Sequence, residues 1–191
     1  MGVLVGKKAP LFEADAVVNG GEFVEKFSLE QYIGKKYVVF FFYPMDFTFV
    51  CPTELEELAK MHPDFKKEGA EIVSVSVDTH YVHFAWHESS PAVGKVRYPM
   101  IADPTRKICN AFGTLIEESG LSRRATFIVD PDGIVKSMHL HDNSIGRSAK
   151  EILRQVKAAS YVREHPGEVC PASWEPGDET LTEGIKLVGK I

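Results

Sequence analysis

The sequence lacks several features that would assign it to a common class. Its 191 residues include only three cysteines. No apolar run approaches the roughly 20 residues that a membrane-spanning helix needs, because the longest strong run covers only residues 37–43. There is no glycine-rich nucleotide-binding fingerprint, no internal repeat and no low-complexity segment. The sequence therefore gives no sign of a membrane span or a bound nucleotide cofactor.

Positive charge and targeting signals are also scarce. The chain has 22 basic and 27 acidic residues, a net charge of −5, which disfavours nucleic acid or an anionic membrane as its main partner. The segment Met1–Lys7 is too short for a signal peptide. Gly6 stands where a myristoylation signal has serine or threonine. We therefore expect a cytoplasmic protein.

The three cysteines are Cys51, Cys109 and Cys170. An odd number in a reducing compartment disfavours a static structural disulfide and leaves reactive or buried thiols as the alternatives. The composition is 44% hydrophobic, which is enough for a core without a disulfide scaffold or a structural metal.

Periodicity and turn signals predict an α/β protein. Asn19-Gly20-Gly21 is typical of a tight hairpin turn, here between strands at residues 12–18 and 22–28. The continuous β-branched and aromatic run at residues 37–43 predicts a central strand that is buried on both faces. Strands alternating with helices, followed by a closing hairpin, predict a sandwich with a mixed central sheet.

The remaining elements follow from caps and prolines. We expect residues 1–162 to form this domain and residues 163–191 to form a proline- and glycine-rich C-terminal arm. We also expect a helix that is opened by Pro52 and is broken or kinked at Pro63, and then a strand at residues 72–77. Two further helices are predicted, one capped by Thr79 and running to about His87, the other between Asp103-Pro104 and Gly113. A hairpin of residues 126–130 and 134–140 follows, and the capping box at residues 148–151 opens the last helix.

Cys51 lies where the buried strand gives way to a helix. Pro52 fits the first helical position, so unpaired N–H groups and the positive end of the helix dipole point at the sulfur. This position favours the thiolate, which is the nucleophilic form. Thr48 can turn its hydroxyl toward the sulfur, and Pro44 can shield one side. A buried structural cysteine is the alternative.

Three separate motifs resemble the typical two-cysteine peroxiredoxins. They are Pro-x-x-x-Thr-x-x-Cys at residues 44–51, within the string Phe-Thr-Phe-Val-Cys-Pro-Thr-Glu, then Arg-Ala-Thr-Phe at 124–127, and His-Pro-Gly-Glu-Val-Cys-Pro-Ala at 165–172. The ending at residues 187–191 resembles that of the bacterial alkyl hydroperoxide reductase C group. The resemblance covers essentially the whole chain. It implies a thioredoxin-like fold with an added N-terminal hairpin.

The resemblance also implies a role for each site residue. Cys51 would be the peroxidatic cysteine, and Thr48 and Arg124 would hold the peroxide oxygens and stabilise the thiolate. Pro44 would shield the sulfur from water. A planar, permanently charged guanidinium suits this task because it can contact sulfur and peroxide oxygen together.

Glu54 and Arg147 would orient Arg124, according to the same resemblance. From the residues alone, Arg124 and Arg147 are better explained as surface salt bridges.

Cys170 matches the resolving cysteine of the family and lies on the arm, far from any Cys-x-x-Cys pattern. The resemblance implies that its disulfide with Cys51 joins two protomers of a homodimer, and that five such dimers form a decameric ring. Cys51 would become a sulfenic acid, Cys170 would condense with it, and an external dithiol protein, a flavoprotein disulfide reductase or a thioredoxin-like protein, would reduce the disulfide. No flavin, haem or metal is implied. A free surface thiol is the alternative for Cys170.

Cys109 falls on one predicted helical face with Thr105, Ile108 and Phe112. This spacing predicts packing in the core rather than catalysis.

Histidines share two predicted faces: His80, His83 and His87 on a helix, and His139 with His141 on a strand. Such spacings can ligate a metal, but no further ligand is close in sequence. We therefore expect exposed polar faces.

Two rival functions remain at this point. A Cys-His hydrolase would need a histidine base beside Cys51. A holdase-type binding protein would use an apolar assembly surface, an activity that some peroxiredoxins combine with peroxidase chemistry.

The sequence also predicts how the protein responds to excess peroxide. Residues 88–95 lack the Gly-Gly-Leu-Gly insertion of peroxide-sensitive relatives, and residues 188–191 lack their Tyr-Phe pair. Easier local unfolding near Cys51 is the expected result, and with it resistance to overoxidation. The alternative is that another contact, from Trp174, clamps the arm.

Overall fold

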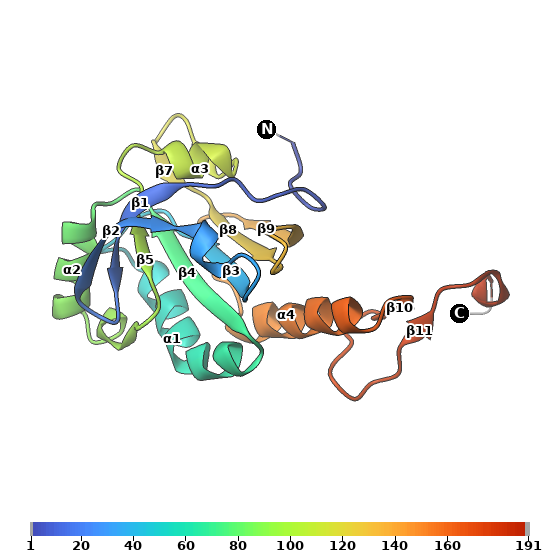
Figure 1. The fold of residues 1–191 in the computed structure, drawn as a ribbon. Coiled ribbons are helices and arrows are strands. Elements are labelled where there is room, and N and C mark those ends of the chain that lie inside the picture. Colours follow the sequence, from blue (N-terminus) through green and yellow to red (C-terminus); the bar gives the residue numbers. More distant parts are fainter. Residues whose placement is uncertain (1, 190–191) are drawn as a thin grey trace.

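A seven-stranded sheet forms the centre of the computed structural model, which describes residues 2–189 (Figure 1). Its strands are β1 (Glu13–Val18), β2 (Glu22–Ser28), β3 (Tyr37–Phe42), β4 (Ala70–Ser76), β5 (Met100–Ala102), β8 (Arg124–Val129) and β9 (Val135–His141). They lie in the order β2-β1-β5-β4-β3-β8-β9. Because β3 pairs parallel with β4 and antiparallel with β8, the sheet is mixed, as predicted.

Helices cover both faces of this sheet. The four α-helices are α1 (Cys51–Lys67), α2 (His80–Ser89), α3 (Lys107–Ala111) and α4 (Ala149–Glu164). Side chains of α1, α2 and α4 join the core on one face, and α3 packs into the core on the other. The short elements are β6 (Leu115–Ile116), β7 (Leu121–Ser122), β10 (Glu168–Val169), β11 (Leu181–Thr182) and three 3-10 turns at Leu29–Tyr32, Val93–Lys95 and Ile185–Leu187. Among residues 2–189, no helix combines the length and apolar character that crossing a membrane requires.

Strand β3 is buried on both faces, as its composition predicts. Val39 and Phe41 point into one core cluster, whereas Phe40 and Phe42 point into the other. All four side chains are almost fully inaccessible to solvent. The strand is therefore a rigid support for the loop that follows it, which leads to Cys51.

Several local predictions are confirmed. The turn between β1 and β2 has positive φ angles at Asn19 (53°) and Gly20 (85°), which is the reason that Asn-Gly is favoured there. Thr79 caps α2, where its hydroxyl accepts a hydrogen bond from Val82 N at 3.4 Å. Ser148 caps α4 in the same way, and β8 and β9 form the predicted hairpin.

Of the break or kink predicted at Pro63, the break is wrong, because α1 continues through Pro63 to Lys67, whereas the kink stays a prediction. Proline removes one N–H group from the helix, but side-chain contacts on both sides of it compensate. His62 is bonded to Glu71 at 2.6 Å, and Phe65 is fully buried.

Three features between residues 100 and 113 also differ from expectation. Asp103-Pro104 does not open α3, which begins only after Arg106 with its left-handed φ of 60°. Asp103 still satisfies the helix start, since its carboxylate accepts a hydrogen bond from Cys109 N at 2.7 Å. Thr105 is exposed and lies outside the helix, so its predicted place on the packed face is wrong. The three-residue strand β5 was not predicted, because so short a segment shows no alternation.

The arm begins as α4 ends at Glu164, and it contains the small β10–β11 hairpin. Figure 1 shows this hairpin beyond the C-terminal end of α4, away from the sheet. The division of the chain at residue 162 stays a prediction. Two predictions concern termini that are only partly described. Met1 of the segment Met1–Lys7 lies outside the described residues, and so do Lys190 and Ile191 of the ending at residues 187–191.

Candidate active site

Cys51 is the first residue of α1, at the end of the loop that follows β3. Its side chain is 0% exposed. No side chain caps the helix at Val50, and Pro52 occupies the first turn, so the positive end of the helix dipole is left open at Cys51. The predicted position of this cysteine at a helix N-terminus is confirmed.

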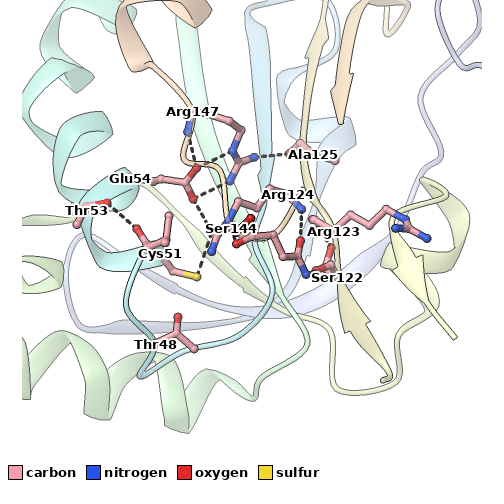
Figure 2. A network of polar contacts seen from close by, with 12 residues as sticks. Thr48, Cys51, Thr53, Glu54, Ser122, Arg123, Arg124, Ala125, Ser144 and Arg147 are labelled. Carbon is pink, nitrogen blue, oxygen red and sulfur yellow. Dashed lines mark hydrogen bonds and ion pairs between the residues drawn. The ribbon is translucent and has the colours of Figure 1, made fainter. Parts of the chain in front are cut away.

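A buried arginine contacts the sulfur. Nη1 of Arg124 lies 3.3 Å from Cys51 Sγ and donates to Glu54 Oε2 at 2.7 Å (Figure 2). Arg124 is the first residue of β8, and Asn143 holds it through two contacts. The Arg124 Nε donates to the Asn143 carbonyl at 2.8 Å, and its backbone N donates to Asn143 Oδ1 at 3.1 Å. The guanidinium is therefore fixed on both sides.

Glu54 joins Arg124 to a second arginine, Arg147. Its Oε1 accepts bonds from Arg147 N at 2.8 Å and Nε at 2.9 Å, and its Oε2 accepts one from Nη2 at 3.1 Å. Nη1 of Arg147 donates to the Ala125 carbonyl at 2.8 Å, and the guanidinium lies over the Phe41 ring at 3.4 Å. All three charged side chains are buried, so surface salt bridges no longer explain the two arginines.

The charges of this cluster are unequal. Two guanidinium groups face one carboxylate, and burial makes the excess positive charge costly. The Cys51 sulfur lies 3.3 Å from Arg124, beside this excess of positive charge. Together with the helix dipole, this arrangement places a positive electrostatic potential at the sulfur, an environment typical of reactive cysteines.

Thr48 and Pro44 lie in the loop before Cys51. Pro44 is buried and Thr48 is partly exposed. In Figure 2 the Thr48 side chain lies beside the Cys51 sulfur. Its hydroxyl donates to the Met45 carbonyl at 3.1 Å, and a rotatable hydroxyl in this place can also reach a bound oxygen. The structure therefore brings Thr48, Arg124 and Cys51 together; their roles stay predictions.

A buried ion pair anchors this loop to α2. Asp46 accepts bonds from the Tyr43 hydroxyl and from His83 Nδ1, each at 2.7 Å. Nε2 of His83 lies 3.1 Å from the Ile101 carbonyl. Since both ring nitrogens face acceptors, the geometry fits the doubly protonated imidazolium. Burial lowers the pKa of His83, but the hydrogen bond and charge of Asp46 outweigh it and leave the pKa above its ordinary value.

The expectation of exposed histidine faces is therefore wrong for His83 and for His87, which are both buried. The helical spacing was correct, but this face packs against the core rather than solvent. His80, His139 and His141 are partly exposed. Across residues 2–189, no group of three or more histidine, cysteine or acidic side chains is arranged to hold a metal ion.

Sequence reasoning missed three supporting residues: Asn143, Phe41 and Asp46. Each acts on a partner far along the chain, and no local pattern marks it. Asp46 stands inside the Pro44–Cys51 motif, yet only its contact with His83, 37 residues later, shows why an acid is there.

The other two cysteines differ sharply. Cys109 is fully buried, which confirms the predicted packing role. Burial and then the neighbouring Asp103 raise the pKa of its thiol to about 12, so it is a poor nucleophile at neutral pH. Cys170 is partly exposed on the arm, and it forms no disulfide in this structure. Burial raises its pKa as well, although Arg154 opposes the shift.

These features define a class of enzyme. A buried cysteine at a helix N-terminus, in contact with a fixed guanidinium beyond the end of the interior strand β3, is typical of a thiol-based redox enzyme. Within the part of the protein that the structure describes, no histidine hydrogen-bonds to the Cys51 sulfur. The site therefore lacks the base of a Cys-His hydrolase.

Comparison with known proteins agrees with this class. The family model described as "AhpC/TSA family" matches residues 5–138, and "C-terminal domain of 1-Cys peroxiredoxin" matches residues 159–188. Alkyl hydroperoxide reductase C of Amphibacillus xylanus is 50% identical over 188 residues, which are 98% of this chain and 99% of that protein.

Solved structures give the same result. The reduced 2-Cys peroxiredoxin of Plasmodium vivax superposes with a TM-score of 0.89 at 38% identity, covering 94% of this chain and 93% of the other. AhpC of Enterococcus faecalis superposes with a TM-score of 0.83 at 45% identity, covering 88% and 99%. The chain belongs to the AhpC/TSA family: it is a peroxiredoxin, an oxidoreductase with peroxidase activity, and it has the predicted thioredoxin fold.

The variant Glu54→Gln tests the charge cluster. It leaves two buried guanidinium groups without a counter-charge, so we expect the free energy of unfolding to fall by about 3–5 kcal/mol. Urea unfolding of the reduced protein measures the change. Glu57→Gln, on the same helix and without a charged partner in the cluster, is the matched control and should change stability by less than about 0.5 kcal/mol. Equal losses in the two variants would contradict the account.

The His83–Asp46 pair predicts a pH dependence. Since the folded pKa of His83 is raised, the pair stabilises the fold fully below its unfolded value near 6.5, and this contribution is lost as pH rises through the folded pKa. His83→Gln can still donate to Asp46 but does not titrate. We expect the difference in unfolding free energy between wild type and His83→Gln to shrink from pH 6 to pH 9. A constant difference across that range would show that His83 does not titrate as described.

Proposed function

We propose that this peroxiredoxin reduces hydrogen peroxide and alkyl hydroperoxides to water and alcohols, with Cys51 as the nucleophile. The observation that carries the proposal is the Arg124 guanidinium, which contacts the Cys51 sulfur and is held by the Glu54 carboxylate. The name of the relatives, alkyl hydroperoxide reductase C, supports the substrate class.

The proposed first step needs only positioning and charge stabilisation. The Cys51 thiolate attacks one peroxide oxygen, the O–O bond breaks, and the other oxygen leaves with a proton as water or alcohol. Arg124 faces the sulfur and can stabilise charge on the peroxide oxygens as the bond breaks, and Thr48 can orient them. Buried Pro44 limits access of water. The product at Cys51 is a sulfenic acid.

Burial of the sulfur favours a small substrate. Cys51 is 0% exposed, so a reagent must be slender, or the loop before the helix must open. A hollow of about 560 Å³ between residues 10–15 and α3 does not include Cys51. A peroxide group fits this restricted access better than a bulky electrophile does.

The proposed second step joins Cys51 to Cys170 of a second protomer. Strand β9 is at the end of the sheet order. Its first residue, Val135, exchanges backbone hydrogen bonds with Gly6 and Lys7, and the rest of its outer edge can pair with another copy. Cys170 lines a hollow between β9 and α4, next to that edge. These positions support a dimer in which the arm of one protomer reaches the other. An external dithiol protein, flavin-dependent or thioredoxin-like, would then reduce the disulfide.

The loop that carries the site also exposes apolar side chains. Phe49 is 92% exposed and Phe47 57%, which is costly unless a second copy of the protein covers them. This exposure supports the expected ring of five dimers. Disulfide formation would require the N-terminal end of α1 to unwind locally, which would disturb the same loop and so link the ring to the redox state. The alternative, a holdase-type chaperone, would use this apolar surface too.

A reducing cytoplasm is the proposed location, since it keeps both thiols reduced.

Cys51→Ser separates the peroxidase from the holdase. With a dithiol reductant supplied, we expect wild type to consume peroxide and the variant to consume none above background, because serine is not a comparable nucleophile. Suppression of aggregation of a heat-unfolded client protein should be equal in the two. Peroxide consumption by Cys51→Ser at the wild-type rate would disprove the assignment.

The partner of Cys51 can be identified on non-reducing gels. After one equivalent of peroxide, wild type and Cys109→Ser should migrate as covalent dimers, because inert Cys109 takes no part. Cys170→Ser should migrate as a monomer. A dimer that survives in Cys170→Ser but is lost in Cys109→Ser would show that the wrong resolving cysteine was chosen.

A further inference from the structure

The side-chain amide of Asn143 extends the hydrogen bonding of the sheet beyond the end of β9. Asn143 follows the last residue of that strand, His141, in the turn that leads to α4. Its Oδ1 accepts a hydrogen bond from Arg124 N at 3.1 Å, and its Nδ2 donates to the Ser122 carbonyl at 3.4 Å. The amide therefore offers one acceptor and one donor to the neighbouring segment, as a backbone amide does between strands.

Ordered structure lies on both sides of this amide. Ser122, which accepts from it, is fully buried. The turn that carries Asn143 is closed by Asp142, whose Oδ1 accepts from Ser144 N at 2.8 Å and whose carbonyl accepts from Ile145 N at 3.0 Å. The Asn143 side chain is thus the link between a preformed turn and the start of β8.

The same residue orients the Arg124 guanidinium through its backbone. The Asn143 carbonyl accepts from Arg124 Nε at 2.8 Å, while Arg124 Nη1 contacts Cys51 Sγ at 3.3 Å and Glu54 Oε2 at 2.7 Å. Two atoms of a planar group are held, which sets the direction of its plane. The hydrogen bonds from the described residues to this guanidinium use Nε and Nη1 only. Nη2 therefore keeps its N–H groups for a substrate oxygen.

We infer that Asn143 is a positioning residue for the reaction of Cys51 with peroxide: its side-chain amide fixes the turn to β8, and so holds its own carbonyl where that carbonyl orients Arg124. The inference rests on the proposed function of Cys51 and Arg124. In the step concerned, the Cys51 thiolate attacks one peroxide oxygen, an S–O bond forms, the O–O bond breaks, and the leaving oxygen takes a proton. The sulfur is oxidised and the peroxide is reduced.

This role predicts a selective effect on the peroxide reaction. Loss of the Asn143 amide leaves the positive charge of Arg124 near the sulfur but lets the guanidinium plane turn. Contacts with peroxide oxygens depend on that plane, because N–H donors stabilise the transition state only when they are aimed at the atoms where charge develops. Iodoacetamide, which loses iodide when sulfur attacks its carbon, does not need this alignment.

Asn143→Ala tests the selective effect. We expect the second-order rate constant of Cys51 with hydrogen peroxide to fall about two- to tenfold, the factor that one hydrogen bond contributes. The rate constant with iodoacetamide should change by less than about twofold, since the charge beside the sulfur is kept. Rapid quenching of the reduced protein, followed by mass spectrometry of the Cys51 peptide, measures both. Asn110→Ala makes the same substitution at an exposed asparagine of α3 and should behave as wild type.

A double-mutant cycle with Arg124→Lys shows whether Asn143 acts through Arg124. Lysine has no Nε–H and no plane for the Asn143 carbonyl to orient. Adding Asn143→Ala to Arg124→Lys should therefore change the peroxide rate constant by less than about twofold. A purely structural role of Asn143 would give the same fall in both backgrounds.

Asn143→Asp is the conservative variant. It keeps an oxygen that can accept from Arg124 N but loses the donor to Ser122, so its ratio of peroxide to iodoacetamide rate constants should lie closer to that of wild type than the ratio of Asn143→Ala does.

An unchanged ratio in Asn143→Ala would overturn the inference, and so would an equal fall of the peroxide rate constant with and without Arg124→Lys. Failure of the proposed function gives a different result, because Cys51 of wild type would then react with hydrogen peroxide no faster than a free cysteine.

Discussion

The carboxylate of Glu54 joins three segments that are far apart in the chain. From the first turn of α1 it accepts hydrogen bonds from Arg124 at the start of β8 and from Arg147, 93 residues away, just before α4. A single buried carboxylate between two guanidinium groups is stable only while all three are in place. The position of Arg124 against the Cys51 sulfur therefore depends on Glu54, and so does the electrostatic field at the site.

The surrounding fold keeps this cluster dry and rigid. Strand β3 is packed on both faces, and its Phe41 ring supports Arg147. The loop from β3 to α1 is tied to α2 through the Asp46–His83 pair. The arm is the opposite case: it has little core and a few side-chain contacts with α4. The chain therefore combines a rigid cluster around Cys51 with a loosely packed arm around Cys170.

Sequence reasoning predicted what local patterns encode. The Asn19-Gly20 turn, the caps at Thr79 and Ser148, the buried strand and the helix start at Cys51 were all correct. It was wrong where distant contacts decide: α1 passes through Pro63 because Phe65 and His62 are packed, and His83 is buried because Asp46 pairs with it. Asn143 could not be found, since its only signal is its contact with Arg124. The family resemblance supplied Arg124 and Arg147, which composition alone assigned to the surface.

The central claim is that the fork of Arg124 acts on the peroxide and on the sulfur together. Arg124→Lys keeps the positive charge but loses the planar fork. The most direct measurement compares second-order rate constants of Cys51 with hydrogen peroxide and with iodoacetamide in wild type and in this variant. The account predicts that the peroxide rate constant falls by at least about 100-fold, the scale of one lost transition-state contact, while the iodoacetamide rate constant changes by less than about tenfold. Equal losses for the two reagents would contradict it.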